Sequence, residues 1–404
     1  MHNRKNIAIL FFTMIVVMIG FGIIIPILPF YVESFGASGS ALGMLMAIFS
    51  IMQFLFAPFW GRLSDQIGRK KVLLIGIFGN ALTMLLFGLS TSLWMLFASR
   101  ALSGILSSAT LPVAMAFISD STDRQTRGGG MGIIGAAMGV GMVLGPGLGG
   151  SVGESSLSLP FFIAAGLSVA AFLLVIAILP ESLPPERRVR GQTLMQGPQF
   201  GMLWRSLFGP LGFLFFLSFL VHFALSNFEA IFGLYALHQF DFGPQRVGTI
   251  LTVIGLVSAV AQGVLTGPVT RRWGDVPVIK TSLIVSAIGS GLLLLAYDYA
   301  TVLLTVGFFV TGNAFLRPAI TSFVSKQSDE GHGMMMGLVN SYMSLGRVVG
   351  PLWAGSMFDL NNALPYLSAG GVLLVSYFLS LRLLQGGGPV TETVEATPQV
   401  SSSD

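Results

Sequence analysis

The stretch IAILFFTMIVVMIGFGIIIPILPF, residues 7–30, contains 24 residues and no charged side chain. A helix of this length extends about 36 Å, whereas the hydrocarbon core of a bilayer is about 30 Å thick. The run follows Met-His-Asn-Arg-Lys and lacks a cleavage site made of small residues. We therefore expect an uncleaved first transmembrane helix rather than a signal peptide.

Eleven further apolar runs follow the first one along the chain. None shows the alternating polarity of a transmembrane β-strand, so the sequence predicts an all-α membrane protein with twelve transmembrane helices. The expected spans are 7–30, 41–60, 72–90, 93–119, 129–152, 160–180, 208–237, 246–268, 278–296, 301–324, 333–357 and 364–385.

The composition of the whole chain agrees with this fold class. Of 404 residues, 53% are hydrophobic and 9% are charged, against about 25% charged in soluble domains, and the mean hydropathy is +0.81. This excludes a cytosolic enzyme and a nucleic-acid-binding protein. Cysteine is absent, which excludes disulfides and thiolate chemistry. Motifs for ATP binding or hydrolysis are also missing, so we expect no ATP use, catalytic residue, cofactor or metal.

The distribution of basic residues predicts the topology. All but four of the 21 Lys and Arg lie at the N-terminus, in loops that follow even-numbered spans, in the central loop or near the C-terminal end. The exceptions are Arg246, in a loop after an odd-numbered span, and three arginines within spans. Positive residues stay in the cytoplasm. We therefore expect a multi-pass protein of the cell (inner) membrane with both termini cytoplasmic, and its pI of 9.5 reflects this bias.

An internal repeat divides the chain into two halves. GMVLGPGLGG (141–150) recurs as GRVVGPLWAG (346–355), and GRLSDQIGR (61–69) recurs in altered form as GPVTRRWGD (267–275). Offsets of 205 and 206 residues indicate parallel repeats of six helices with a cavity between them. We expect six-helix bundles at 1–180 and 208–385, a central cytoplasmic loop at 181–207 and a disordered cytoplasmic tail at 386–404.

The segment GRLSDQIGRKK (61–71) falls between the second and third spans. Gly61 and Gly68 permit a tight turn, and Asp65 suits the positive N-terminus of a neighbouring helix, which the repeat suggests is span 11. Arg69, next to Lys70, is placed to pair with Asp120. In the second repeat, Arg271 matches Asp65 and Asp275 matches Arg69, so the charges are reversed.

The run GMVLGPGLGG in the fifth span combines a flat glycine face with a proline. Glycines four residues apart allow close helix packing, and Pro146 bends the helix. The residues that define the pattern are Gly141, Gly145, Pro146, Gly149 and Gly150.

Both segments resemble signatures of the major facilitator superfamily, and nearly the whole chain resembles its drug:proton antiporter branch, which includes NorA- and Bmr-type multidrug exporters and tetracycline exporters. The resemblance implies that the 61–71 cluster, with Asp120, latches the outward-facing state, and that the glycine run marks export by antiport. A plain topological turn and plain packing glycines are the alternatives to these two functions.

Charged residues within spans are costly and are therefore candidates for function. Glu229, in VHFALSNFEAIFGLYAL, is the only acidic residue deep in a span, and the resemblance implies a role in proton coupling or drug binding. Arg100, in RALSGILSSA, resembles the family's intramembrane arginine. It would bond the first helix and influence proton movement, or serve only as a structural bond to backbone carbonyls. The family's second carboxylate is replaced by Ala314.

We expect the substrate cavity to involve residues of three spans in the second half. Arg347 is a counter-ion to Glu229, a contact for an anionic substrate group or a snorkelling side chain, and His222 is a ligand or a satisfied helix histidine. Gln53, Gln262, Asn227 and Tyr342 either line the cavity or bond neighbouring helices. The predicted cavity residues are His222, Phe228, Phe232, Asn313, Asn340, Arg317 and Arg347.

Together these features predict a secondary transporter that exports drugs or other small amphipathic molecules in exchange for protons by alternating access. Its partners would be substrate, protons and the lipid bilayer, and we expect a monomer. A sugar or metabolite exporter or uniporter of the same fold remains an alternative, as does a non-transporting receptor or scaffold. The charges within the spans count against the latter.

Overall fold

The computed structural model describes residues 2–123, 126–189, 200–327 and 332–384. Throughout these ranges the ordered elements are helices, and no strand is found. Apolar segments adopt this form in a membrane because a helix satisfies every backbone N–H and C=O internally. The expected all-α membrane fold is confirmed.

The first half begins close to the N-terminus and ends near residue 178. Its helices are α1 (His2–Ser34), α2 (Gly39–Ile67), α3 (Arg69–Gly88), α4 (Leu93–Leu106) continued by η1 (Ser107–Ala109) into α5 (Thr110–Ser121), α6 (Arg127–Gly153) and α7 (Leu159–Ile178). A single residue, Gly68, separates α2 from α3. Its φ of 108° is a backbone conformation that favours glycine.

The second half follows η2 (Pro185–Arg187) and the short α8 (Phe200–Ser206). Its helices are α9 (Gly212–Phe240), α10 (Pro244–Val260) continued by the π-helical η3 (Ala261–Leu265) into α11 (Thr266–Trp273), α12 (Asp275–Leu292) with η4 (Leu293–Leu295), α13 (Tyr299–Lys326), α14 (His332–Leu360) and α15 (Leu364–Leu383). Asp298 caps α13 by accepting the Thr301 N–H at 2.8 Å. The Thr301 hydroxyl and N–H lower the pKa of this exposed carboxyl.

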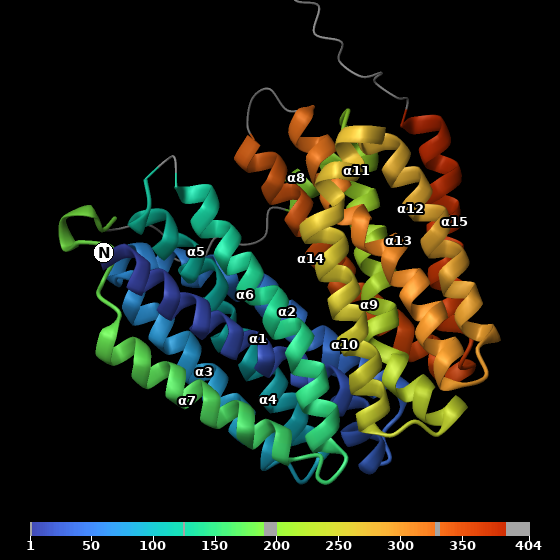
Figure 1. The fold of residues 1–404 in the computed structure, drawn as a ribbon, viewed down its shortest axis with the longest axis horizontal. Coiled ribbons are helices and arrows are strands. Elements are labelled where there is room, and N and C mark those ends of the chain that lie inside the picture. The colour runs from blue at the N-terminus through green and yellow to red at the C-terminus, as the bar shows by residue number, and fades with distance from the viewer. Residues whose placement is uncertain (1, 124–125, 190–199, 328–331, 385–404) are drawn as a thin grey trace, which may run out of the picture.

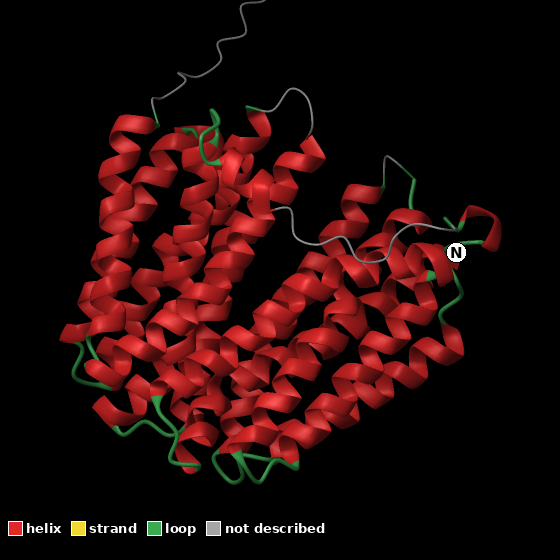
Figure 2. Ribbon diagram, turned by 180° about the vertical axis from the view of Figure 1, so that it is seen from behind, coloured by secondary structure: helices red, strands yellow, loops and turns green. Residues whose placement is uncertain are grey.

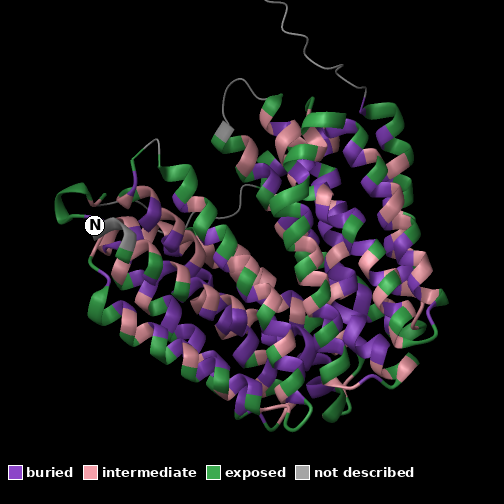
Figure 3. Ribbon diagram, viewed as in Figure 1, coloured by how far each residue is buried: buried purple, intermediate pink, exposed green. Residues whose placement is uncertain are grey.

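Twelve long helical segments match the twelve expected spans. Among the described residues, eleven are long and apolar enough to cross a bilayer. The twelfth is α14, which has 29 residues and packs against α9 and α2. Figure 3 shows exposed positions along the outer faces of the bundles. Large apolar side chains such as Trp94, Leu173 and Leu304 are among the exposed residues of the chain. Such a surface suits lipid rather than water.

The helices form two bundles, α1–α7 and α9–α15, that converge at one end and diverge at the other (Figures 1 and 2). The N-terminus and the end of α15 both lie on the divergent side. The space around the glycines differs between the two ends in the same way. A Cβ on Gly150 of α6 would meet Gly248 of α10 at 2.8 Å, whereas a Cβ on Gly132 or Gly139 would meet nothing within 4 Å.

Two carboxylates tie the halves together at the convergent end. Asp359, near the end of α14, accepts the N–H groups of Gly39 and Ser40 at 2.7 and 2.9 Å, at the start of α2. Glu154, just after α6, accepts the N–H of Gln245 at 3.1 Å, at the start of α10. Asp359 and Glu154 are 205 residues apart, as are Gln245 and Ser40. The two caps are therefore equivalent under the internal repeat, and each crosses between the halves.

Candidate functional site

A pocket of about 470 Å³ lies in the second half. It is bounded by η3, α13 and α14, and it is lined by Gln262, Arg317, Pro318, Thr321, Met336, Val339, Asn340 and Met343. Sulfur and aliphatic groups share this lining with a guanidinium, two amides and a hydroxyl. A volume of this size lies within the range of small-molecule sites, and apolar and polar residues contribute equally to its lining.

Gln262 reaches the pocket from an irregular part of its helix. It lies in the π-helical η3 and is exposed. Single π-turns inside α-helices occur frequently at functional sites because they redirect side chains. Of the two interpretations of Gln262 offered by the sequence, cavity lining is the one that the structure shows.

Arg347 occupies the same face of α14 as the pocket residues Met336, Asn340 and Met343, because these positions are three or four residues apart. Both Arg347 and Arg317 are exposed although each lies in the middle portion of a long helix. Arg347 donates from Nη2 to the Ser344 hydroxyl at 3.1 Å. Within the described ranges this is its only side-chain hydrogen bond, and Arg317 has none.

Glu229 lies on α9, the helix against which α14 packs most closely. A Cβ on Gly346 would meet His222 at 2.9 Å, and one on Gly350 would touch the Phe223 carbonyl at 2.7 Å, so the neighbouring Arg347 is held beside α9. Glu229 is half-buried and interacts electrostatically with Arg347. No cation in the described residues lies within 4.0 Å of its carboxylate, so the two groups are neighbours without forming an ion pair.

His222 is buried about two turns before Glu229 on the same face of α9. Its Nδ1 donates to the Ser218 carbonyl at 3.1 Å, and both Arg317 and Arg347 act on it electrostatically. Arg347 thus acts electrostatically on Glu229, His222 and Arg317, and the role of these residues in a substrate cavity stays a prediction. The ring is also satisfied by its own helix, so it serves as a structural histidine whatever else it does.

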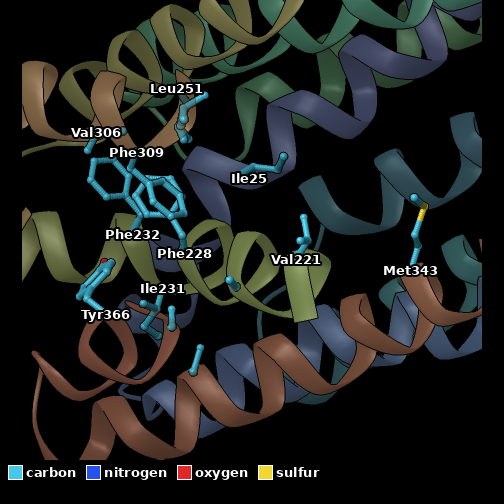
Figure 4. Close-up of a cluster of buried hydrophobic side chains, with 14 of the residues drawn as sticks. Ile25, Val221, Phe228, Ile231, Phe232, Leu251, Val306, Phe309, Met343 and Tyr366 are labelled. Atoms are coloured by element: carbon cyan, nitrogen blue, oxygen red, sulfur yellow. The ribbon is translucent and has the colours of Figure 1, made fainter. Parts of the chain in front are cut away.

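Three predicted cavity residues are placed elsewhere. Phe228 and Phe232 are 3% and 0% exposed, and Phe228 packs against Phe309 and Tyr366 with ring centroids 5.2 and 6.4 Å apart (Figure 4). Both rings are therefore packed inside the second half and do not line the pocket, and their role in a substrate cavity stays a prediction. Asn313 is also buried, and its Nδ2 has no described partner. Asn340 is the predicted amide that does line the pocket.

Arg100 is buried at 1% exposure and contacts α2 rather than α1. Its guanidinium lies 4.5 Å from the centre of the Phe49 ring, and Nη2 approaches the Met46 sulfur at 3.5 Å. The expected bond to the first helix is absent from the described residues, where Nε and Nη1 lack partners. A cation–π contact on an aromatic face takes the place of that bond.

The 61–71 segment forms a compact ionic cluster within the first half. Arg69 contacts Asp65 at 2.6 Å and Asp120 at 2.9 Å, so the expected pairing with Asp120 is confirmed. Its Nη1 also donates to Ser64. Asp65 makes no bond to the described part of α14, contrary to the expected contact with span 11, because the halves diverge here. Gly61 lies inside α2 and makes no turn, whereas Gly68 does.

Glu181 was missed by the sequence analysis and completes this cluster. It accepts the backbone N–H groups of Arg69 at 2.8 Å and of Lys70 at 3.4 Å, at the start of α3, while the Lys70 amine donates to the Ile176 carbonyl. A carboxylate is favoured at a helix N-terminus. Its position directly after a long apolar run was the available signal.

The second copy of the cluster contains an ion pair in which the acidic and basic positions are exchanged. Asp275 accepts from Lys326 at 2.7 Å, and these residues are each 206 positions after Arg69 and Asp120. The reversal expected at Asp275 thus extends to its partner, which sequence reasoning missed. The pseudo-equivalent position of the pair is preserved although both charges are exchanged.

The glycine run of α6 packs against α1 and α10. A Cβ on Gly145 would meet Gly22 of α1 at 2.7 Å, and one on Gly149 would meet the Ile23 carbonyl at 2.9 Å. Gly150 faces α10, so the run joins a helix of its own half to one of the other half. The close packing expected of these glycines is observed.

The major facilitator superfamily model matches residues 10–228 and 214–402 of the chain. Multidrug resistance protein 2 of Bacillus subtilis is 33% identical and covers 94% of this chain and 96% of its own length. Quinolone resistance protein NorA of Staphylococcus aureus is 29% identical with the same coverage. The crystal structure of the human organic anion transporter MFSD10 matches with a TM-score of 0.66 and 25% identity, over 94% of this chain and 99% of that one.

Proposed function

The chain belongs to the major facilitator superfamily, and we propose that it is a drug exporter of this family that exchanges protons for small amphipathic molecules. Relatives that carry drug-resistance names match almost its whole length, which supports the substrate class and a role in antibiotic resistance. It is a transporter and not an enzyme. The proposal that protons are exchanged is argued from residues of this chain.

The observation that carries this proposal is the position of Glu229. It is the acidic residue deep in a span, it is half-buried, and no cation within the described ranges neutralises it by a close ion pair. A carboxylate in such a place can take up and release a proton as the cavity opens to either side. Arg347 lies near enough to act on it electrostatically.

The cycle we propose alternates between two openings of the same cavity. The positive-inside bias favours a cytoplasmic position for both termini, so the divergent end seen here would be the cytoplasmic side and the structure would be the inward-open form. Drug enters and the proton leaves Glu229 toward the cytoplasm. The halves then rock, the caps of Asp359 and Glu154 break, and an external proton replaces the drug.

The ionic cluster at 61–71 would act as the cytoplasmic latch in this cycle. In the open form Arg69 binds Asp65 and Asp120, and Glu181 fixes the start of α3. We propose that Asp65 turns to the N-terminal end of α14 when this side closes, because a carboxylate is stabilised there. Lys70, Gly61 and Gly68 would support the geometry of the loop, and the glycine run of α6 would serve as the packing surface for rocking.

Glu229→Gln tests proton exchange directly. In proteoliposomes with an imposed pH gradient, this variant should lose uphill transport of a fluorescent drug because glutamine cannot carry a proton. It should retain exchange of labelled for unlabelled drug, since its shape and hydrogen bonding are similar. Glu186→Gln, at an exposed position in η2, is the matched control. Uphill transport at the wild-type rate by Glu229→Gln would refute proton coupling through this residue.

A further inference from the structure

We infer that Glu33 of α1 and His238 of α9 form a pH-sensitive tie between the two halves at the convergent end, so that acid on that side holds this end shut. The inference concerns how the halves meet. It goes beyond the proposed export function, which assigns the pair no role, and its test needs neither a drug nor transport.

The first support is the contact itself, which joins the two halves. The imidazole Nε2 of His238 lies 3.3 Å from a carboxylate oxygen of Glu33. The two side chains are 37% and 42% exposed, so water and protons reach them. While the ring is neutral, the contact is one hydrogen bond between a neutral donor and a carboxylate. Once the ring is protonated, it becomes an ion pair, which is the stronger interaction.

The second support is the position of the pair in the internal repeat. Glu33 and His238 are 205 residues apart, as are Glu154 and Asp359, so each is the repeat counterpart of the other. Two counterparts can touch only near the axis that relates the halves, and halves that rock must separate there. A glutamate at both positions would place two like charges together. The histidine replaces this repulsion with attraction, but only while it holds a proton.

The third support is the packing around the histidine. The His238 ring lies against the Phe358 ring of α14, with centroids 5.7 Å apart. A Cβ on Gly39, at the start of α2, would meet Phe358 at 3.1 Å, and the next residue, Asp359, caps the same helix. Phe358 therefore packs between His238 and α2. Separation of the halves at this point would break the tie and the Asp359 cap together.

The other charged and titratable groups at this end do not change charge in the same pH range. Carboxylates, tyrosine and arginine ordinarily keep one charge state between pH 5 and 8, whereas a histidine changes its charge there. Of the four histidines in the chain, His238 is the one at the convergent end. The remaining described groups near this end of α9 and of the helices around it are Tyr31, Glu154, Tyr235, Asp241, Arg246, Asp298, Tyr299, Asp359 and Tyr366.

Several of these groups also have partners of their own. Glu154 and Asp359 hold backbone N–H groups, Asp298 caps α13, and the Arg246 guanidinium lies 5.3 Å from the centre of the Phe242 ring. The first turn of α2 contains no acidic residue. The charge of this part of the molecule therefore responds to pH mainly through His238.

The direction of the pH effect follows from linkage between proton binding and conformation. A form that keeps the pair in contact takes up the proton of the histidine more readily than a form in which the pair has separated, so added protons favour the closed convergent end. The effect is lost as the pH rises and the ring becomes neutral. In the proposed cycle this end faces the outside, and the acidity that delivers a proton to the carrier would also close the gate behind it.

Distances between two spin labels, measured by pulsed electron paramagnetic resonance, test the tie without transport. The labels are attached at Ser156→Cys and Asn362→Cys, in loops of opposite halves at the convergent end. The parent protein carries Glu229→Gln, so that its central carboxylate cannot respond to pH. Lowering the pH from about 8.5 to about 5.5 should raise the ratio of short to long distances roughly two- to fivefold, which is the scale of a half-exposed ion pair.

His238→Gln and Glu33→Gln should each abolish this pH response, because glutamine can form a hydrogen bond but not the ion pair. The exchanged double variant, Glu33→His with His238→Glu, should restore it, since the two positions are counterparts. His332→Gln, at the opposite end of α14, is the matched control. A full response in His238→Gln, no response in the parent protein or an equal loss in His332→Gln would overturn the tie. Each of these results would leave drug export standing, because no transport enters the measurement.

Discussion

At Gly150 of α6, a hydrogen atom in place of a side chain lets the two halves touch. A Cβ there would collide with the Pro244 carbonyl oxygen and lie 2.8 Å from the Gly248 Cα. Both obstacles are backbone atoms, so neither can rotate away, and α6 and α10 would have to separate.

We therefore expect Gly150→Ala to shift the protein toward a form that is open at the convergent end. The chain contains no cysteine, so spin labels can be attached at Ser156→Cys and Asn362→Cys, one in each half, and their distance should increase. Gly139→Ala, on the same helix with nothing within 4 Å, gives the control for the helix propensity of alanine. The packing argument fails if the two alanine variants give the same distances.

Single residues in α9 show where sequence reasoning reached its limit. Glu229 was identifiable because a carboxylate within an apolar span is rare. The directions in which Phe228 and Phe232 point were not identifiable. Helix α9 is apolar and buried on nearly all sides, so its sequence pattern does not distinguish one side from another. The partners of Arg100 were equally hidden, because an aromatic ring and a sulfur on α2 carry no charge to reveal them.

Among the helical elements, α12 and α13 are linked by the Asp275–Lys326 pair, in which the carboxylate is 3% exposed and the amine 64%. Lys326→Met leaves Asp275 with the Ser322 hydroxyl at 3.3 Å, so we expect a loss of about 1–3 kcal/mol in stability. Adding Asp275→Asn should recover part of it by removing the uncompensated charge.

Thermal unfolding in detergent measures both effects, with Arg272→Met as an exposed control. If the double variant is as unstable as the sum of the single variants, the two side chains are not coupled. The pair occupies the same position in both repeats, with its charges exchanged. We therefore infer that Asp275 and Lys326 hold α13 against the start of α12, as Arg69 and Asp120 hold α5 against α3.

For the whole molecule, the two caps across the halves define which end is closed. We expect the double variant Asp359→Asn and Glu154→Gln to shift the balance of forms by roughly tenfold or more, because each helix N-terminus loses an anionic cap worth about 1 kcal/mol. The labels at positions 156 and 362 would report longer distances. Asp298→Asn removes the charge from a cap within one half and should not move the halves. A similar shift in both variants would contradict this role of the caps.

The number and order of the spans were predictable because bilayer thickness fixes the length of an apolar run. The repeat likewise predicted the equivalence of the Arg69 and Asp275 regions. The contacts through which the two halves meet were not predictable. Asp359 and Glu154 lie at helix ends where a solvated carboxylate is ordinary, and only their backbone partners, 319 and 91 residues away, show what they do.

The uncrowded glycines of α6 also affect how quickly this molecule can change form. Gly128, Gly129, Gly132, Gly135 and Gly139 have no atom within 4 Å of a Cβ position, and Gly333 and Gly337 of α14 are equally free. Glycine has no rotamers, so backbones that come together along these segments lose no side-chain entropy. Closing the open end would then demand little ordering of new surface. Turnover would be governed mainly by the release of Asp359 and Glu154 at the far end.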